Sequence, residues 1–197
     1  GVTHLNIKIN QLRIDGFVKN TPLRCYYCKK ELMSRLIKAA QQRGFDTVFE
    51  GSNADDDNDY RPGMRAVKEL GVLSPLKNAE LTKSEIRRLS KVLGLSTYSK
   101  PSLACLATRI EYDEEITAQK LRMTDRAEQV LCDLGLTQVR VRMNDNSARI
   151  EVPFDEMKIV FDNSKYINDA LKKIGYDFVS LDLEGYKTGK MNININN

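Results

Sequence analysis

The sequence predicts an α/β protein in two parts, and two observations carry this prediction. In the first half, a short apolar segment at 47–49 reads as a strand that runs into a polar loop at Gly51, where α/β folds place ligands. From residue 117 the pattern changes to helix, hairpin, helix and strand. We therefore expect one domain at 1–115 and a second domain, with the order αββαβ, at 116–197.

The first part begins with apolar and polar residues in alternation over 5–12, which predicts a short strand. Asn20, Thr21 and Pro22 then form a helix-start signal. Apolar side chains at a spacing of four follow and end at Gly44, a typical C-terminal cap. A long amphipathic helix is therefore expected before the strand at 47–49.

A second helix is predicted where Thr82 and Glu85 form a capping box, and it ends at Gly94. Residues 96–112 show no periodicity and contain Cys105. We interpret this stretch as an ordered functional loop.

Local signals predict each element of the second part. Its helix begins at Thr117 and ends before Gly135. The segment Asn144-Asp145-Asn146 separates two alternating runs and so indicates a hairpin. The expected elements are a helix at 117–134, strands at 138–143 and 147–152, a helix at 154–174 broken near 162–163, and a last strand at 178–183.

Composition places the chain among ordinary globular proteins. Its 197 residues contain 31 basic and 27 acidic side chains, for a net charge of +4, and 41% are hydrophobic, which argues against disorder, collagen and coiled coil. No apolar stretch of about 18 residues and no leader pattern occurs, so we expect a cytoplasmic protein with no membrane partner. The single histidine, His4, excludes a Ser-His-Asp triad and poly-histidine metal sites. Basic residues are scattered, so nucleic-acid binding is not indicated.

Cysteines are therefore the candidates for metal or covalent chemistry. Cys25 and Cys28 form a Cys-x-x-Cys pair at a helix start, where the thiolate is favoured, and Cys105 stands alone in a loop. Three thiolates suit a [4Fe-4S] cluster with one open iron better than a closed zinc site. A redox pair and incidental thiols are the alternatives. Cys132 lies among apolar helix residues and is interpreted as a packed core or boundary thiol without chemistry.

Two arginines offer an anion site. Arg140 and Arg142 are two apart on a predicted strand and so share one face, which Arg149 and Glu151 of the next strand should share. Paired guanidinium groups suit phosphate or carboxylate. A solvated face with weak cross-strand ion pairs is the alternative.

Acidic and basic residues near the cysteine pair allow two interpretations each. The aspartates of the loop at 55–59 could bind Mg²⁺ or form a solvated turn. Lys29 and Lys30 follow the cysteine pair, and one of them could place a positive charge beside it, although a surface lysine is the default.

Five segments of the chain, in the same order, strongly resemble the LarE family. They are 21–30 (Thr-Pro-Leu-Arg-Cys-Tyr-Tyr-Cys-Lys-Lys), 50–63, 100–109, 139–142 and 183–192, with Asp59-Tyr-Arg-Pro-Gly63 and the closing Gly-Tyr-Lys-Thr-Gly-Lys-Met-Asn the most specific. LarE proteins are PP-loop, ATP-pyrophosphatase-type sulfur transferases that build the nickel-pincer nucleotide cofactor of lactate racemase. The resemblance implies that residues 1–115 belong to a PP-loop domain, a parallel-sheet fold similar to adenine nucleotide α-hydrolases.

The resemblance also implies a reaction. ATP adenylates a carboxylate of pyridinium-3,5-biscarboxylic acid mononucleotide, pyrophosphate leaves, and sulfur displaces AMP to give a thiocarboxylate. One subtype of the family sacrifices the sulfur of a loop cysteine, and the other holds sulfide on a [4Fe-4S] cluster bound by three cysteines. The sacrificial position aligns with Ala104, so Cys25, Cys28 and Cys105 resemble the cluster subtype.

Further roles follow from the same match. Lys29 and Arg109 would be catalytic, Arg140 and Arg142 would hold the substrate phosphate, and Glu128 and Glu151 match acidic positions without an assigned role. The residues expected near the nucleotide are Gly51, Asn53, Asp59 and Arg61. ATP with Mg²⁺ is the implied co-substrate, and we expect a homo-oligomer.

One departure from the family affects these expectations. The chain opens at Gly1 and lacks the family's Ser-Gly-Gly-x-Asp-Ser loop, the kind of loop that cradles pyrophosphate. We therefore expect that the chain by itself cannot activate a carboxylate and that the activity belongs to a longer polypeptide. A tRNA-thiolating PP-loop enzyme and a non-catalytic metal-binding fragment are the alternative functions.

Overall fold

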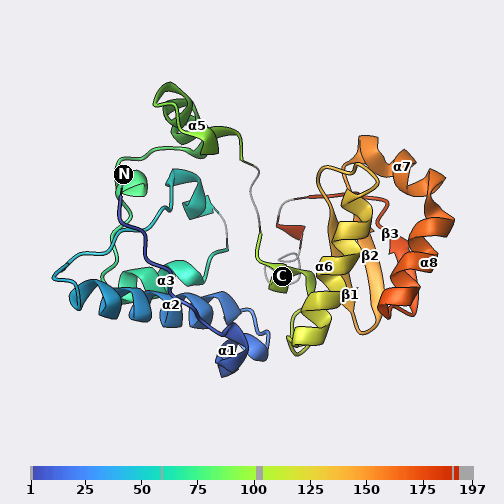
Figure 1. Ribbon diagram of the computed structural model, residues 1–197, viewed down its shortest axis with the longest axis horizontal. Helices are drawn as coiled ribbons and strands as arrows, with labels where there is room; N and C mark the ends of the chain where they lie inside the picture. The colour runs from blue at the N-terminus through green and yellow to red at the C-terminus, as the bar shows by residue number, and fades with distance from the viewer. Residues whose placement is uncertain (1, 59, 101–103, 188, 191–197) are drawn as a thin grey trace. The chain divides into compact units, whose positions relative to one another are not determined.

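The computed structural model describes residues 2–58, 60–100, 104–187 and 189–190. The chain divides into two compact units (Figure 1). The first comprises residues 1–17 and 22–103, and the second comprises 18–21 and 104–197. Among the described residues, no helix combines the length and the apolar character needed to cross a bilayer.

The first unit is mainly helical. Its longest helix, α2, lies beside α3 (Figure 1), and Met33 of α2 packs with Val67 of α3 and Val72 in a small buried core. The helices in chain order are η1 (Gln11–Arg13), α1 (Asp15–Val18, which runs into the second unit), α2 (Arg24–Gln41), η2 (Ala54–Asn58), α3 (Gly63–Glu69), α4 (Pro75–Asn78), α5 (Lys83–Val92) and η3 (Ser96–Ser99), where η marks a short 3₁₀ helix. The predicted capping box is confirmed, because Thr82 and Glu85 bond each other's backbone at the start of α5.

Two sequence predictions for this unit are corrected. Residues 5–12 form no strand, because no neighbouring segment pairs with them, and η1 begins inside this range. The strand at 47–49 is reduced to a single parallel bridge between Phe49 and Leu73, with backbone bonds to Leu73 on either side. Within the described residues of this unit, that bridge is the extent of the parallel pairing.

Asn20, predicted to start a helix, instead binds backbone carbonyls of the second unit. Asn20 is fully buried with a φ of 53°, and its side chain donates to the carbonyls of Ile110 and Glu111 at 3.3 and 2.6 Å. The helix α2 starts later, after Leu23. Asn20 therefore ties the segment 18–21 to the second unit instead of capping a helix.

The second unit has the predicted order αββαβ. Strands β1 (Arg140–Asn144) and β2 (Ser147–Glu151) form the antiparallel hairpin, and β3 (Phe178–Leu181) pairs in parallel with β2, so the sheet order is β1-β2-β3. The helices are η4 (Leu106–Arg109), α6 (Ala118–Cys132), η5 (Phe154–Glu156), α7 (Met157–Asp162) and α8 (Ser164–Ile174). The predicted break near 162–163 is confirmed, because α7 ends at Asp162.

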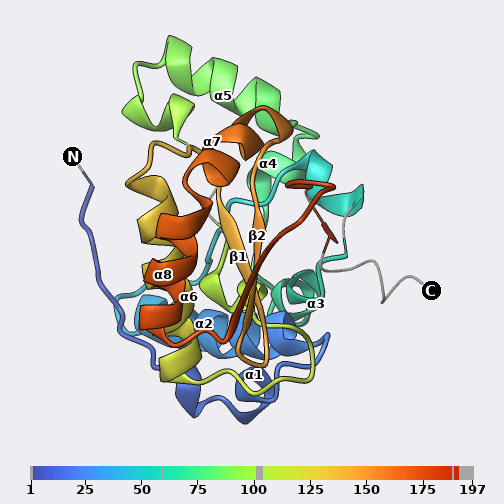
Figure 2. The same ribbon diagram turned by 90° about the vertical axis from the view of Figure 1, so that its right-hand side faces the viewer.

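Helices α6 and α8 lie side by side against the sheet (Figure 2). Their buried residues, which include Leu131 and Leu171, meet the apolar face of β1 and β2 in the main core of this unit. Along β1, buried Val141 and Met143 alternate with Arg140 and Arg142, as the strand pattern predicts. The sheet thus presents its arginines on the face away from the core.

Candidate functional site

The cysteine pair lies at the start of α2, and we call residues 25–28 the cysteine turn. Leu23 precedes this helix without a side-chain cap, but its carbonyl oxygen accepts from the backbone N–H groups of Tyr26 and Tyr27 at 2.9 and 3.3 Å. The Cys25 thiol is exposed, and the half-buried Cys28 Sγ accepts a hydrogen bond from Gln11 Nε2 at 3.4 Å. Side chains three apart on a helix share a face, so the two thiols can serve one metal centre together.

Lys29, next to the pair, is held by a buried carboxylate. Its Nζ lies 3.2 Å from Glu50 Oε2, and the Glu50 side chain is only 7% exposed. Glu50 Oε1 also accepts from Ser74 Oγ at 2.6 Å and from the Ser52 backbone N–H at 3.1 Å. Burial raises the pKa of Glu50, but the hydrogen bonds from Ser52, Ser74 and Lys29 outweigh it and lower this pKa to about 2. Glu50 is therefore ionised and fixes the Lys29 ammonium near the cysteines.

The loop after Glu50 is ordered by its own polar groups. Asp56 is buried, accepts from the Asn53 backbone N–H at 3.0 Å and pairs with Arg61 Nη1 at 2.8 Å. Asn53 Oδ1 accepts from the Asp55 N–H at 3.0 Å. Asp59, the other expected nucleotide-proximal acid, lies outside the described residues. The structure thus brings Asn53 and Arg61 to the same carboxylate.

Two further loop residues depart from the expected arrangement. Asp55 Oδ2 accepts from the backbone N–H of Lys83 at 2.8 Å, at the start of α5. A Cβ at Gly51 would meet nothing within 4 Å, so local packing does not require a glycine there. The interpretation of the acidic loop as a solvated turn is wrong for Asp56, because its carboxylate is buried and paired.

A close contact joins the end of this loop to the cysteine turn. A Cβ built on Gly63 would lie 3.3 Å from the Cys25 carbonyl oxygen and 3.5 Å from Lys29 Cβ. Because so short a distance leaves little room for a side chain, glycine lets the start of α3 approach α2. The motif that ends at Gly63 therefore sits directly against the turn that carries the cysteines.

Sequence reasoning missed the side chain that lies between the two cysteines. Tyr26 is buried, donates its hydroxyl to Glu69 Oε2 at 2.7 Å and accepts from Lys30 Nζ at 2.9 Å. The guanidinium carbon of Arg65 lies 4.8 Å from the centre of its ring. Tyr26 thus connects the cysteine turn to α3. No local sequence signal predicts this contact, because its two residues are 43 positions apart.

In the second unit, Arg109 forms a two-point ion pair. Its Nε and Nη2 donate to the two oxygens of Glu128 at 2.7 and 3.0 Å, and the Arg109 side chain is only 4% exposed. Glu128 Oε1 also accepts from the Val141 N–H at 3.0 Å, which links α6 to β1. Arg109 Nη1 further donates to Thr108 Oγ1 at 2.9 Å. The arginine expected to be catalytic is therefore engaged inside the fold.

Arg142 is similarly engaged. Its Nε and Nη2 contact Glu151 Oε2 at 3.1 and 3.0 Å, and its Nη1 donates to the Thr108 carbonyl at 2.6 Å. Arg149, as predicted, shares this face, with Nη2 at 3.6 Å from Glu151 Oε1. The alternative of a solvated face with weak ion pairs does not hold for Glu151, whose side chain is 0% exposed, although Arg149 remains 54% exposed.

Arg140 differs from the other two arginines. No carboxylate in the described part of the chain pairs with it; its Nη1 donates to the Val139 carbonyl at 2.6 Å, and its guanidinium lies 5.3 Å from the Tyr186 ring centre. Burial, together with repulsion from Arg109 and Arg142, lowers the pKa of Arg140. Because this guanidinium is partly desolvated and has no ion pair among the described residues, it is the one best prepared for an anionic ligand.

The closing segment positions Tyr186. Gly185 has a φ of 72°, and a Cβ there would lie 2.9 Å from the Val152 carbonyl oxygen. The next N–H, of Tyr186, donates to that same oxygen at 2.9 Å. Lys190 Nζ then pairs with Asp182 Oδ2 at 2.7 Å. Glycine is required at 185 because the residue there has a left-handed conformation and its Cα lies close to the backbone of Val152.

The remaining two cysteines lie in the second unit. Cys105 is exposed, directly before η4. Cys132 is also exposed, so it is not a core thiol; Leu131 takes the buried position on that turn. Partial burial nevertheless raises the pKa of the Cys132 thiol, as at the boundary of a core. In the part of the chain that the structure describes, no three His, Cys, Asp or Glu side chains are gathered as a metal-binding group.

Known proteins match almost the whole chain. It is 40% identical over 194 residues to an uncharacterized protein of Synechocystis, covering 98% of this chain and 72% of the relative. It is 35% identical over 184 residues to the pyridinium-3,5-bisthiocarboxylic acid mononucleotide synthase of Lactiplantibacillus plantarum, covering 93% of this chain and 67% of that enzyme. An uncharacterized protein of Methanocaldococcus jannaschii is 34% identical over 185 residues, covering 94% of this chain and 71% of that protein. No protein-family model matches.

These matches agree with a mixed α/β fold that carries a cysteine turn in one unit and an arginine cluster in the other. The chain belongs to the LarE family, that of the pyridinium-3,5-bisthiocarboxylic acid mononucleotide synthase. The resemblance that the motifs indicate is thereby confirmed at the level of the family.

Proposed function

We propose that this protein is a sulfur transferase that converts a carboxylate of pyridinium-3,5-biscarboxylic acid mononucleotide to a thiocarboxylate for nickel-pincer cofactor assembly. The observation that carries the proposal is the 35% identity to the named synthase over 93% of the chain. The guanidinium of Arg140, which has no ion pair among the described residues, supports it, because the substrate carries both phosphate and carboxylate groups.

The chemistry proceeds in two displacements. A substrate carboxylate oxygen attacks the α-phosphorus of ATP, and pyrophosphate leaves with Mg²⁺ neutralising its charge. Sulfide then attacks the activated acyl carbon, and the acyl–oxygen bond breaks to release AMP. One oxygen of the substrate is thereby replaced by sulfur, and nothing is oxidised or reduced.

We assign roles to the basic residues on their surroundings. Arg140 binds the substrate phosphate, and Arg142, held by Glu151 and Thr108, stiffens the strand beside it. Lys29, fixed by ionised Glu50, supplies positive charge near the cysteine turn for the charge that develops on the acyl oxygens.

Further roles rest on the family resemblance. Arg109, which follows Cys105 in the sequence, is one of the catalytic residues. The nucleotide lies near Gly51, Asn53, Asp59 and Arg61. Residues 1–115 are part of a PP-loop domain, and 116–197 form the small αββαβ domain. The protein works in the cytoplasm as a homo-oligomer.

The donor set fits an iron–sulfur cluster in its chemistry. Cys25 and Cys105 are exposed, Cys28 is half-buried, and all three thiols are free of disulfides. We propose these three as the ligands of a [4Fe-4S] cluster, which when bound would supply an open iron able to carry sulfide. The cysteines of this chain hold the cluster, and Arg140 holds the anionic substrate.

Iron analysis tests the cluster. Protein purified without oxygen should contain about four irons per chain, and Cys25→Ala, Cys28→Ala and Cys105→Ala should each lose most of that iron. Cys132→Ala is the control, because its thiol is exposed like those of Cys25 and Cys105 but is given no role, and it should keep the iron. Iron-free protein that thiolates the substrate at the full rate would overturn the cluster proposal.

A further inference from the structure

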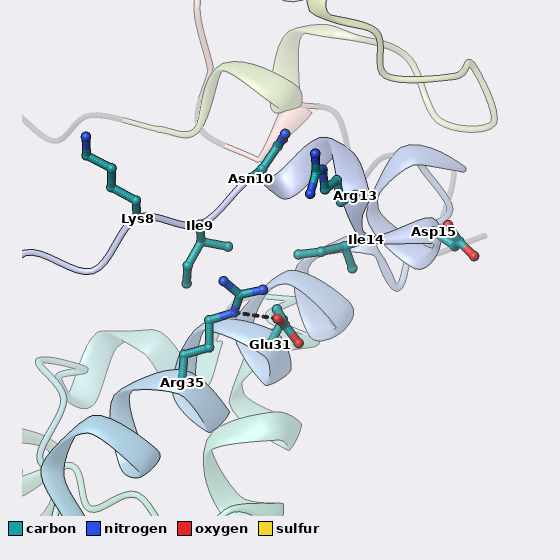
Figure 3. A pocket seen from close by; sticks show the side chains of 8 residues that line it. All are labelled: Lys8, Ile9, Asn10, Arg13, Ile14, Asp15, Glu31 and Arg35. Carbon is teal, nitrogen blue, oxygen red and sulfur yellow. Dashed lines mark hydrogen bonds and ion pairs between the residues drawn. The ribbon is translucent and has the colours of Figure 1, made fainter. Parts of the chain in front are cut away.

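A pocket opens in the first unit between the N-terminal segment and α2, and the acidic loop contributes nothing to its lining. Its volume is about 630 Å³, within the range of small-molecule sites. One wall is the stretch around Ile9 and Ile14, and the other is α2 at Glu31 and Arg35 (Figure 3).

The pocket joins apolar walls to positive charge. The side chains of Ile9 and Ile14 face the guanidinium of Arg35 across it (Figure 3), and Arg13 of η1 also lines the pocket. Asp15 lies at the far edge with its carboxylate turned outward (Figure 3). The arginines can therefore contact the anionic group of a ligand, and the isoleucines can contact its apolar part.

The basic side chains of the pocket differ in whether an acidic side chain pairs with them. Arg35 Nε is paired with Glu31 Oε1 at 2.6 Å. Arg13 and Lys8, which also lines the pocket, have no ion pair with any side chain in the described residues. Arg35 keeps its Nη donors beyond the single bond to Glu31. Lys8, Arg13 and Arg35 thus each keep N–H donors for a ligand oxyanion.

The same segment touches the cysteine turn. Gln11, which lies between the pocket residues Ile9 and Arg13, donates to Cys28 Sγ at 3.4 Å. Cys28 and Arg35 are seven residues apart on α2 and therefore lie on one face of that helix. A ligand that bridges the two walls would hold the segment, and with it Gln11, against Cys28.

We propose that this pocket binds a small organic oxyanion, a phosphate monoester or a carboxylate with an apolar body, and that its occupancy shields Cys28. Arg13 and Arg35 bind the oxyanion, and Ile9 and Ile14 pack against the apolar body. None of the residues that line the pocket is assigned to the proposed sulfur transfer, so binding can be tested apart from it. Only the shielding of Cys28 involves a residue that the proposed function uses.

Equilibrium dialysis with four probes tests the binding. Phenyl phosphate and benzoate carry both features, inorganic phosphate carries only the charge, and benzyl alcohol carries only the apolar body. We expect phenyl phosphate, benzoate or both to bind more tightly than either single-feature probe. Whichever of the two binds identifies the source of the oxyanion.

Three variants locate the site. Arg13→Gln and Ile14→Thr should each weaken binding of phenyl phosphate or benzoate, the former about tenfold because it removes a charge-assisted contact. Lys38→Gln, an exposed change on the same helix outside the pocket, should leave the affinity unchanged. Equal weakening by Lys38→Gln and Arg13→Gln, or no preference for probes that carry both features, would overturn the proposal.

Alkylation of the metal-free chain gives a second readout. The bound probe should slow the modification of Cys28 by iodoacetamide several-fold while leaving that of Cys132, exposed in the other unit, unchanged. Arg13→Gln should remove this protection. Unchanged alkylation of Cys28 at saturating probe would contradict the coupling through Gln11.

Discussion

Arg109 donates to both carboxylate oxygens of Glu128, at 2.7 and 3.0 Å, and this pair joins η4 to α6 at the edge of the arginine cluster. Glu128 also accepts from the backbone of Val141 on β1. The carboxylate therefore compensates the charge of Arg109 and leaves Arg140 as the arginine open to a ligand.

The first prediction concerns this pair. Arg109→Gln should lower the free energy of unfolding of the second unit by about 3 kcal/mol, because it leaves a largely buried carboxylate without its partner. Urea unfolding followed by circular dichroism measures the change. Lys158→Gln removes an exposed pair, with side chains 81% and 52% exposed, and should cost less than about 0.5 kcal/mol. Equal effects of the two changes would contradict the buried role of Arg109.

The second prediction follows from the pKa of Glu50, which folding lowers from 4.5 to about 2. Such a carboxylate stabilises the folded state above pH 4.5, and this stabilisation is lost as the pH falls toward 2. Glu50→Gln should therefore reduce stability at pH 7, and its difference from the natural protein should shrink between about pH 5 and pH 2. Thermal unfolding across this range measures it, with exposed Asp46→Asn as the control. A difference independent of pH would exclude an ionised, hydrogen-bonded Glu50.

The third prediction compares two glycines with a positive φ, of which only Gly185 lies close to other backbone atoms. Gly185→Ala should destabilise the second unit by about 2 kcal/mol, since it combines a φ of 72° with a Cβ only 2.9 Å from the Val152 oxygen. Gly189→Ala is matched in φ, at 78°, but meets nothing within 4 Å, and should cost about 1 kcal/mol. Chemical unfolding compares the two. A cost at position 189 as large as that at 185 would show that the close approach has no energetic effect.

The fourth prediction concerns the ring beside Arg140. Tyr186→Leu should raise KM for the mononucleotide about fivefold and leave kcat unchanged, because the ring only positions a guanidinium that binds substrate. Tyr186→Phe keeps the aromatic face and should behave like the natural protein. Steady-state kinetics of all three forms decides, and a loss of kcat in Tyr186→Leu would argue against a positioning role.

Sequence alone predicts much of the second unit because its signals are local. Thr117 caps α6 within three residues, and Asp145 adopts a φ of 48° in the hairpin turn that the asparagine-rich segment indicates. The alternation along β1 likewise predicts that Arg140 and Arg142 share one face, because side chains two apart on a strand point the same way. Each of these signals spans fewer than about ten residues.

The features that sequence reasoning missed depend on distant partners. The alternation of apolar and polar residues does not predict that Glu151 is buried. Its burial depends on Arg142 and Arg149, which pack against it on the same face of the sheet. The role of Asn20 depends on backbone 90 residues away. The strand predicted at 5–12 has the right pattern but no strand to pair with, and the end of the segment turns into η1 instead.

The most direct test of the central claim is the product itself. The native polypeptide that carries this sequence, purified without oxygen, is incubated with ATP, Mg²⁺, sulfide and pyridinium-3,5-biscarboxylic acid mononucleotide, and the mononucleotide is analysed by mass spectrometry. Our account predicts exchange of a carboxylate oxygen for sulfur, with one AMP and one pyrophosphate formed for each exchange. Mononucleotide that binds to the protein but is recovered with both carboxylates unchanged would contradict it.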